Sequence, residues 1–197
     1  MRAMHMTRAW ASLGLALVLA GCGAGAGTTP FTVPYGTGAR YRPPAMWHGI
    51  ADGRPVARLR CSAATEPRAA AHLELFAHGR GIVVPAGLGI AAPHRVDGAY
   101  VRGGRCSYPL RTREPTGLLE LAPGRRATLG DVFALLGQPL TATRLAAHRG
   151  PVRVWRNGRR WHGAPAALPI RARDQVVVVA GAGRVPVHAT YRFPPGA

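Results

Sequence analysis

The segment HLELFAHGRGIVVP, residues 72–85, gives the clearest structural signal in this chain of 197 residues. Hydrophobic and polar residues alternate over residues 72–76, which is typical of a β-strand. His78-Gly79 can then form a turn, and residues 81–85 can return as the partner strand. The segment therefore predicts a β-hairpin.

Three later segments also predict strands. Residues 152–156 (VRVWR) lead into Asn157-Gly158, the best hairpin turn in the sequence. Residues 176–180 (VVVVA) form a short apolar run that suits a buried strand. Residues 185–193 alternate regularly, and Pro186 cannot donate to a ladder, so an edge strand is expected there.

One helix is expected, over about residues 128–136. Thr128 can cap its start, and Asp131 favours the positive end of the helix dipole. Gly137 and Pro139 can end it. Together these elements predict a mainly β fold: a small sandwich or an α+β sheet with one short helix.

The start of the chain has the organisation of a secretory signal. Residues 1–8 are basic, with Arg2 and Arg8, and residues 9–19 (AWASLGLALVL) are apolar and uncharged. That apolar run is about 16 Å long as a helix, whereas a membrane span needs roughly 20 residues. The run is therefore too short for a stable membrane helix.

Leu19-Ala20-Gly21-Cys22 follows the apolar run and resembles the lipobox of bacterial lipoproteins. The resemblance implies that a diacylglycerol is joined to the Cys22 sulfur and that cleavage leaves Cys22 as the new N-terminus. The alternative is an ordinary secretory signal with an incidental cysteine. We expect a signal peptide at residues 1–21, a lipidated N-terminus and flexible tether at 22–45, and a single β-rich extracytoplasmic domain at 46–197.

The chain is strongly basic. Its formal net charge is +18, and removal of the signal with Arg2 and Arg8 lowers this to +16. Such a charge favours anionic lipid head groups, wall polymers or nucleic acid. The basic residues are all arginine and are spread along the chain, without a recognition-helix or ribonucleoprotein motif. We therefore expect an anionic envelope polymer or a protein as partner, beside the membrane itself, and no nucleic acid.

The chain has three cysteines, an odd number for an exported protein. If lipidation uses Cys22, then Cys61 and Cys106 remain as one pair, and a disulfide persists outside the cytoplasm. Closing this loop would stabilise the fold by roughly 4 kcal/mol. The alternative is two unpaired or metal-binding thiols, although no CxxC spacing supports it.

An ordered set of motifs spans residues 49–137. It comprises Gly49-Ile50, Cys61, AAHL at 70–73, HG at 78–79, VPAGLGI at 84–90, Cys106, RTREPTG at 111–117, LLEL at 118–121 and TLGDVF at 128–133. This order resembles a family of uncharacterised bacterial secreted proteins and lipoproteins. The family has His-Ala-His-Leu and His-Thr-His-Asp where this chain has AAHL and RTRE.

The paired histidines of that family look like metal ligands, because residues two apart on a strand project to one face. Here Ala70 replaces one of them and leaves His72, while Arg111 and Arg113 replace both members of the other pair. Glu120 stands where a later histidine would be. Since a guanidinium cannot bind a cation, the resemblance implies that such a metal site is lost or replaced.

Two interpretations of Arg111 and Arg113 remain open. They could hold a carboxylate or phosphate in a remodelled site. They could instead pair with Glu114 and Glu120 in a structural network, which is the favoured interpretation.

No catalytic or nucleotide-binding motif stands out, and we expect no cofactor. The remaining histidines are scattered without ligand spacing. The leading hypothesis is a membrane-anchored, non-catalytic binding or structural domain of the cell envelope. One alternative is a copper- or zinc-binding lipoprotein that uses His72. Another is an envelope enzyme of unknown reaction, with a pocket around Arg111, Arg113 and Glu120.

Overall fold

The computed structural model describes residues 50–63, 67 and 69–196. The signal peptide, Cys22 and the tether expected at 22–45 lie outside the described residues, as does the expected domain start at residue 46. Within the described residues, no helix has the length and apolar character needed to cross a membrane.

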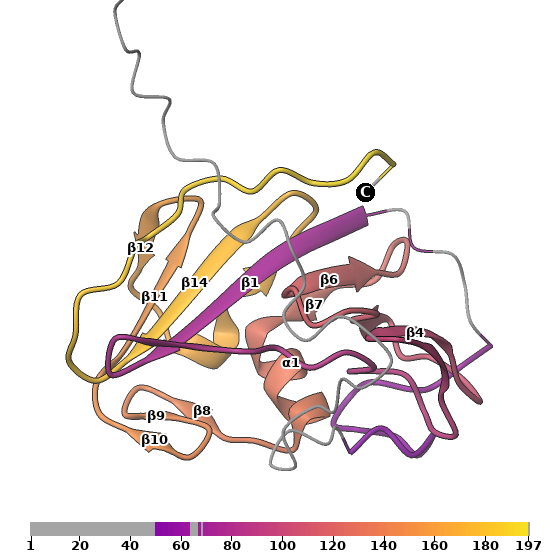
Figure 1. Ribbon diagram of the computed structural model, residues 1–197. Helices are drawn as coiled ribbons and strands as arrows, with labels where there is room; N and C mark the ends of the chain where they lie inside the picture. Colours follow the sequence, from indigo (N-terminus) through magenta and orange to yellow (C-terminus); the bar gives the residue numbers. More distant parts are fainter. Residues whose placement is uncertain (1–49, 64–66, 68, 197) are drawn as a thin grey trace, which may run out of the picture.

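A seven-stranded sheet forms the centre of the domain, in the order β12-β11-β14-β1-β6-β5, with β2 also paired to β1 (Figure 1). Its strands are β1 Ala69–Ala77, β2 Arg80–Ile82, β5 Leu110–Arg111, β6 Leu118–Leu121, β11 Val152–Arg156, β12 Arg159–Trp161 and β14 Gln175–Ala180. The predicted mainly β fold is confirmed. Of the two arrangements expected, the structure has a sheet covered by a helix.

Both predicted hairpin turns occur. The β1–β2 turn has positive φ at His78 (50°) and Gly79 (80°), and the β11–β12 turn has positive φ at Asn157 (52°) and Gly158 (74°). Two positive φ values in a two-residue loop match the twist of the flanking strands. These local turns thus follow directly from the sequence.

β14 contains the predicted buried strand at 176–180. It pairs in parallel with β1 and antiparallel with β11, so neither of its edges is free. All six of its residues are buried, because both faces of the sheet are covered here. The continuous apolar run is what a strand covered on both faces requires.

The inner face of the sheet packs against helix α1, Leu129–Leu136. On β1 this face carries Ala71, Leu73 and Leu75, and on β14 it carries Val176 and Val178. The predicted helix cap is present. The Thr128 hydroxyl accepts a hydrogen bond from the Asp131 backbone N–H, and the Asp131 carboxylate accepts one from the Thr128 backbone N–H. Gly137 ends the helix at φ 64°. The predicted short helix is confirmed.

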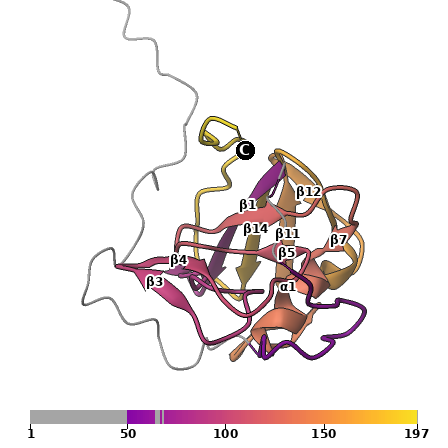
Figure 2. The ribbon, with the colours of Figure 1, turned by 90° about the vertical axis from the view of Figure 1, so that its right-hand side faces the viewer.

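The outer face of the same strands is partly polar. β1 presents His72, Glu74 and Phe76 there, and β14 presents Gln175, Val177 and Val179. Figure 2 shows the C-terminal segment on the opposite side of the sheet from α1. We call residues 185–193 the C-terminal segment; Val185 packs against the outer apolar cluster of Phe76, Val177 and Val179.

The prediction of an edge strand at residues 185–193 is wrong, because this segment forms no β-ladder. It crosses the outer face instead of extending the edge of the sheet. Its partly buried residues are Val185, His188, Tyr191 and Phe193. The first three are spaced by three, the period of extended polyproline II chain rather than of a strand. The alternation in the sequence therefore indicated extended backbone but not pairing.

Smaller elements surround the sheet. They are the hairpin β3–β4 (Arg95–Asp97, Tyr100–Gly103), the pair β7–β13 (Ala127–Thr128, Pro169–Ile170), the sheet β8–β9–β10 (Leu140–Thr141, Arg144–Leu145, His148–Arg149) and the 3-10 helix η2 (Pro165–Ala167). Cys61 and Cys106 form the predicted disulfide, with their Cα atoms 5.7 Å apart. The alternative of two free thiols is thereby excluded.

Candidate functional site

Ala70, His72, Arg111 and Glu120, four of the positions considered above for a metal or remodelled site, lie on the outer face of the sheet. In the strand register, Ala70 lies opposite Glu120, and Glu120 lies opposite Arg111. His72 follows Ala70 by two residues on the same face, a displacement of about 7 Å along a strand. The structure therefore brings these positions to one region, although they come from three strands.

Arg111 and Arg113 both contact Glu120. Arg111 Nε donates to Glu120 Oε2 at 2.6 Å, and Arg113 Nε donates to Glu120 Oε1 at 3.1 Å. Arg113 also donates to the backbone carbonyl of Arg102. Glu114 contacts Thr116 by a side-chain hydrogen bond, and burial raises its pKa. The two arginines and Glu120 thus hold each other in a partly buried network.

Arg111 has an unsatisfied group within this network. The residue is 4% exposed, and its Nη2 atom has no hydrogen-bond partner among the described residues. It lines a small cavity of about 10 Å³ together with Glu120 and Tyr108. A space of that size holds about one water molecule.

His72 is fully buried at the centre of the outer face. Its Nε2 lies 2.9 Å from the Thr116 carbonyl oxygen, and its Nδ1 lies 2.8 Å from Gln175 Oε1. The ring of Tyr191 stacks on it, with centroids 3.7 Å apart. Burial lowers the pKa of His72 to about 4, so the imidazole is neutral at neutral pH.

Glu74 is the second buried titratable group of this face. His188 Nδ1 donates to Glu74 Oε2 at 2.8 Å. Glu74 Oε1 has no hydrogen-bond partner among the described residues, and it lies 3.9 Å from His72 Nδ1. Burial raises the pKa of Glu74 and of Tyr191. We call His72, Glu74, Gln175, His188 and Tyr191 the outer polar cluster.

Four members of this cluster were not identified as site residues from the sequence: Glu74, Gln175, His188 and Tyr191. The sequence placed His188 and Tyr191 on opposite faces of an independent edge strand. Their partners are 114 and more residues away in the chain, and no local pattern reports such a contact. The one indication in the sequence was the pair His72 and Glu74. These two polar residues lie on one face of a predicted strand, and burying them requires another segment to pack on that face.

His72 was also the weak candidate for a metal ligand. Both of its ring nitrogens have hydrogen-bond partners, and Tyr191 covers the ring. Among the residues that the structure describes, no group of three or more His, Cys, Asp or Glu side chains is placed to hold a metal ion. The arrangement around His72 is that of a satisfied core histidine.

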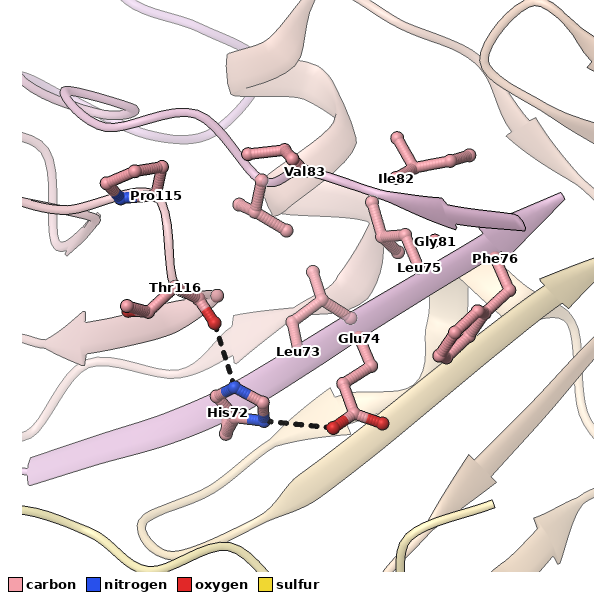
Figure 3. Close-up of a pocket in the computed structure, with 12 residues that line it drawn as sticks. His72, Leu73, Glu74, Leu75, Phe76, Gly81, Ile82, Val83, Pro115 and Thr116 are labelled. Carbon is pink, nitrogen blue, oxygen red and sulfur yellow. Dashed lines mark hydrogen bonds and ion pairs between the residues drawn. The ribbon is translucent and has the colours of Figure 1, made fainter. Parts of the chain in front are cut away.

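A cavity of about 240 Å³ lies beside β1, between β2 and the loop before β6 (Figure 3). Its walls are mainly apolar, and His72 and Glu74 contribute the titratable side chains. Its lining residues are 72–76 of β1, 81–84 of β2 and the chain that follows it, and 115–117 of the loop before β6.

A larger groove of about 970 Å³ lies beside the disulfide and is lined in part by Cys61. Four arginines line it: Arg58, Arg60, Arg125 and Arg126. All four are exposed, and no acidic side chain is among the described residues that line the groove. Only Arg58 has an ion-pair partner within the described part, Asp131 at 2.6 Å. We call this the arginine groove.

Comparison of the chain with protein-family models, with curated proteins and with solved structures finds no match.

Proposed function

We propose that this protein is a membrane-anchored, extracytoplasmic and non-catalytic domain that binds an anionic polymer of the cell envelope. The observation that carries the proposal is the arginine groove. It offers four exposed guanidinium groups in one concave surface. Guanidinium groups bind phosphate and carboxylate oxygens in a planar, two-point geometry.

The groove suits a polymer better than a small ligand. It is open, and the hydroxyl-bearing residues Ser62 and Ser107 line it together with the arginines. A repeating anion presents several charges to several guanidinium groups at once. Each exposed ion pair is weak alone, at about 0.2–1 kcal/mol, so several together are needed for useful affinity.

The compartment is supported by the use of cysteine. The Cys61–Cys106 disulfide accounts for two of the three cysteines, and disulfides persist outside the cytoplasm. The third, Cys22, ends the lipobox-like tetrapeptide. Two acyl chains on Cys22 would hold the domain at the membrane stably, as a single chain would not.

The non-catalytic part of the proposal is supported by the outer polar cluster. His72 is bonded at both ring nitrogens and lies beneath Tyr191. Glu120 is held by two arginines. These groups are engaged with each other, which favours a structural role over proton transfer to a substrate.

Binding is tested with the full chain in detergent, titrated with a glycerol phosphate polymer and, separately, with uncharged dextran. We expect binding of the phosphate polymer alone, weakening as salt is raised, because salt screens exposed charges beyond about 10 Å at 0.1 M. The variant R60Q/R125Q/R126Q should weaken binding about tenfold, from roughly 1–2 kcal/mol of lost ion pairs.

The matched control is R149Q/R159Q/R171Q, which removes the same charge from exposed positions that do not line the groove. It should leave the affinity within about twofold of the parent. Equal losses in the two triple variants would mean that only net charge matters, and the groove would no longer be the site.

The anchor is tested by intact mass spectrometry of the chain recovered from bacterial membranes. We expect a mature N-terminus at Cys22 that carries diacylglycerol, and no such species from the Cys22→Ser variant. An unmodified N-terminus in the parent would contradict the anchored location while leaving the binding experiment informative.

A further inference from the structure

The cavity beside β1 arises from a gap in the main sheet. On the edge of β1 away from β14, β6 pairs with residues 69–72 and β2 pairs with residues 75–77. Among the described residues, no strand lies beside Leu73 and Glu74 on that edge, and the backbone contact there is the bond from the Leu73 amide to the Gly117 carbonyl at 2.9 Å. The chain after β2 and the loop before β6 diverge around this gap and enclose about 240 Å³ (Figure 3).

The walls of the cavity fit a small apolar body. Leu73, Leu75, Phe76, Ile82 and Val83 contribute aliphatic and aromatic surface. An apolar cavity of about 150 Å³ is enough to admit benzene. A cavity of about 240 Å³ therefore accommodates a benzene ring with a short substituent.

Glu74 supplies the one buried acid of the lining. Its side chain is 5% exposed, and His188 occupies only Oε2. Oε1 has no partner among the described residues. A buried carboxylate oxygen without a donor is costly, by about 1–3 kcal/mol or more. The site therefore needs a hydrogen-bond donor at this atom.

Gln175 does not supply that donor while His72 is neutral. The Thr116 carbonyl can only accept, so the His72 proton sits on Nε2 and Nδ1 must accept. The group that satisfies Nδ1 is the NH₂ of the Gln175 amide, whose oxygen and nitrogen exchange places by a half-turn. That orientation gives a partner to the amide nitrogen, which otherwise has none, and turns the amide oxygen of Gln175 toward Glu74, so that Oε1 still lacks a donor.

We propose that the cavity binds a small, mainly apolar molecule that carries one hydrogen-bond donor, with the donor on Glu74 Oε1 and the apolar body against Leu73, Ile82 and Val83. This site is separate from the arginine groove and does not depend on the proposed function. The donor is an ammonium or a hydroxyl group, and both give a charge-assisted bond to a carboxylate.

Three probes of similar size test the donor: benzylamine, benzyl alcohol and anisole, which has no donor. The full chain in detergent is labelled at its Ile, Leu and Val methyl groups, and each probe is titrated by nuclear magnetic resonance. We expect shifts at Ile82, Val83 and Val84, and affinity for at least one donor probe about tenfold or more above that for anisole. Equal affinities for all three, or no shifts at these methyl groups, would overturn the proposal.

Two substitutions test the carboxylate and the apolar walls of the cavity separately, and the first changes the carboxylate. Glu74→Gln keeps an acceptor oxygen but removes the charge, so benzylamine binding should fall about tenfold or more and benzyl alcohol binding far less. Asp97→Asn is its control, since Asp97 lies on the exposed β3–β4 hairpin. A probe that binds E74Q as it binds the parent would show that Glu74 is not its partner.

Val83→Phe fills the cavity and should abolish binding of every probe. Its control is Val96→Phe, at a residue that is 63% exposed on the β3–β4 hairpin. If V83F does not fold, Ile82→Phe fills the same space from the neighbouring position. Unchanged probe binding by a folded cavity-filling variant would place the site elsewhere.

Discussion

The two faces of the main sheet are built from the same strands, yet they are stabilised in different ways. The inner face of β1 and β14 is entirely apolar and is covered by α1, a helix with its own cap. The outer face carries His72, Glu74 and Gln175, and the C-terminal segment covers it without joining a ladder. The inner cover is thus held by apolar contact and the outer cover by a few specific pairs.

This difference determines how each face responds to change. Burial of apolar surface is non-directional, so the inner face tolerates a substitution in proportion to the volume lost. Each polar group of the outer face depends on one or two specific partners, and removing a partner leaves a buried polar atom unsatisfied. The largest single effects are therefore expected where a buried charge loses its only counter-charge.

Glu120→Ala should cost the most, at about 3–5 kcal/mol of the free energy of unfolding. Arg111 is 4% exposed and pairs with Glu120 at 2.6 Å, so the variant leaves a buried guanidinium without a carboxylate. Denaturant unfolding measures the loss. Asp97→Ala, which breaks the exposed pair with Arg102, is the control and should cost about 0–1 kcal/mol. Similar losses in the two variants would remove the distinction between buried and exposed pairs.

Leu75→Ala on the inner face should cost about 3 kcal/mol, within the range for a buried leucine that leaves a cavity. Val187→Ala on the C-terminal segment should change the free energy of unfolding by less than about 0.5 kcal/mol, because Val187 is 36% exposed. Both free energies are measured by denaturant unfolding, under the condition that the dependence of the free energy on denaturant concentration is the same in parent and variant. A loss at Val187 as large as that at Leu75 would mean that the outer cover is an apolar core like the inner one.

The inner face was the more predictable of the two. The alternation at residues 72–76, the VVVVA run, both two-residue turns and the Thr128 cap are all local signals, and each appears in the structure. The cysteine count also identified the Cys61–Cys106 bond without any structural information. Local backbone preferences and residue counts are sufficient for features of this kind.

The outer face was less predictable because its contacts join distant parts of the chain. His188 is 114 residues from Glu74, and the alternation over residues 185–193 fits a strand as well as extended chain lying over a sheet. The resemblance selected Arg111, Arg113 and Glu120, which the structure brings into contact. It gave no indication of Gln175 or Tyr191, or of the gap between β2 and β6.

The pH dependence of stability should reveal the outer polar cluster. The pKa of His72 is lowered by burial to about 4 in the fold, against an ordinary value of 6.5. The unfolded chain therefore takes up this proton first, and the free energy of unfolding falls as pH drops from 6.5 to 4. The loss from this group reaches about 3 kcal/mol. Glu74, whose pKa is raised, acts in the opposite direction and offsets part of it.

His72→Gln isolates the histidine contribution. Between pH 6.5 and 4, the variant should lose less stability than the parent, since it has no imidazole to protonate on unfolding. Unfolding curves recorded at half-unit pH steps give, for the parent and for the variant, the slope of the free energy of unfolding against pH. Parallel slopes would show that His72 titrates equally in both states, and the outer face would then lack a buried neutral imidazole.

Tyr191→Ala should have a smaller effect on stability than Glu120→Ala or Leu75→Ala and a more specific effect on the site. Loss of the ring stacked on His72 at 3.7 Å should cost about 1–2 kcal/mol. Because the ring also keeps water from His72, its removal should raise the histidine pKa from about 4 towards 6.5. Phe193→Ala, which removes the ring beside Tyr191 and leaves Tyr191 over His72, should not move that pKa. A histidine pKa unchanged in Y191A, measured by nuclear magnetic resonance, would mean that the sheet alone buries His72 and that the C-terminal segment is not its cover.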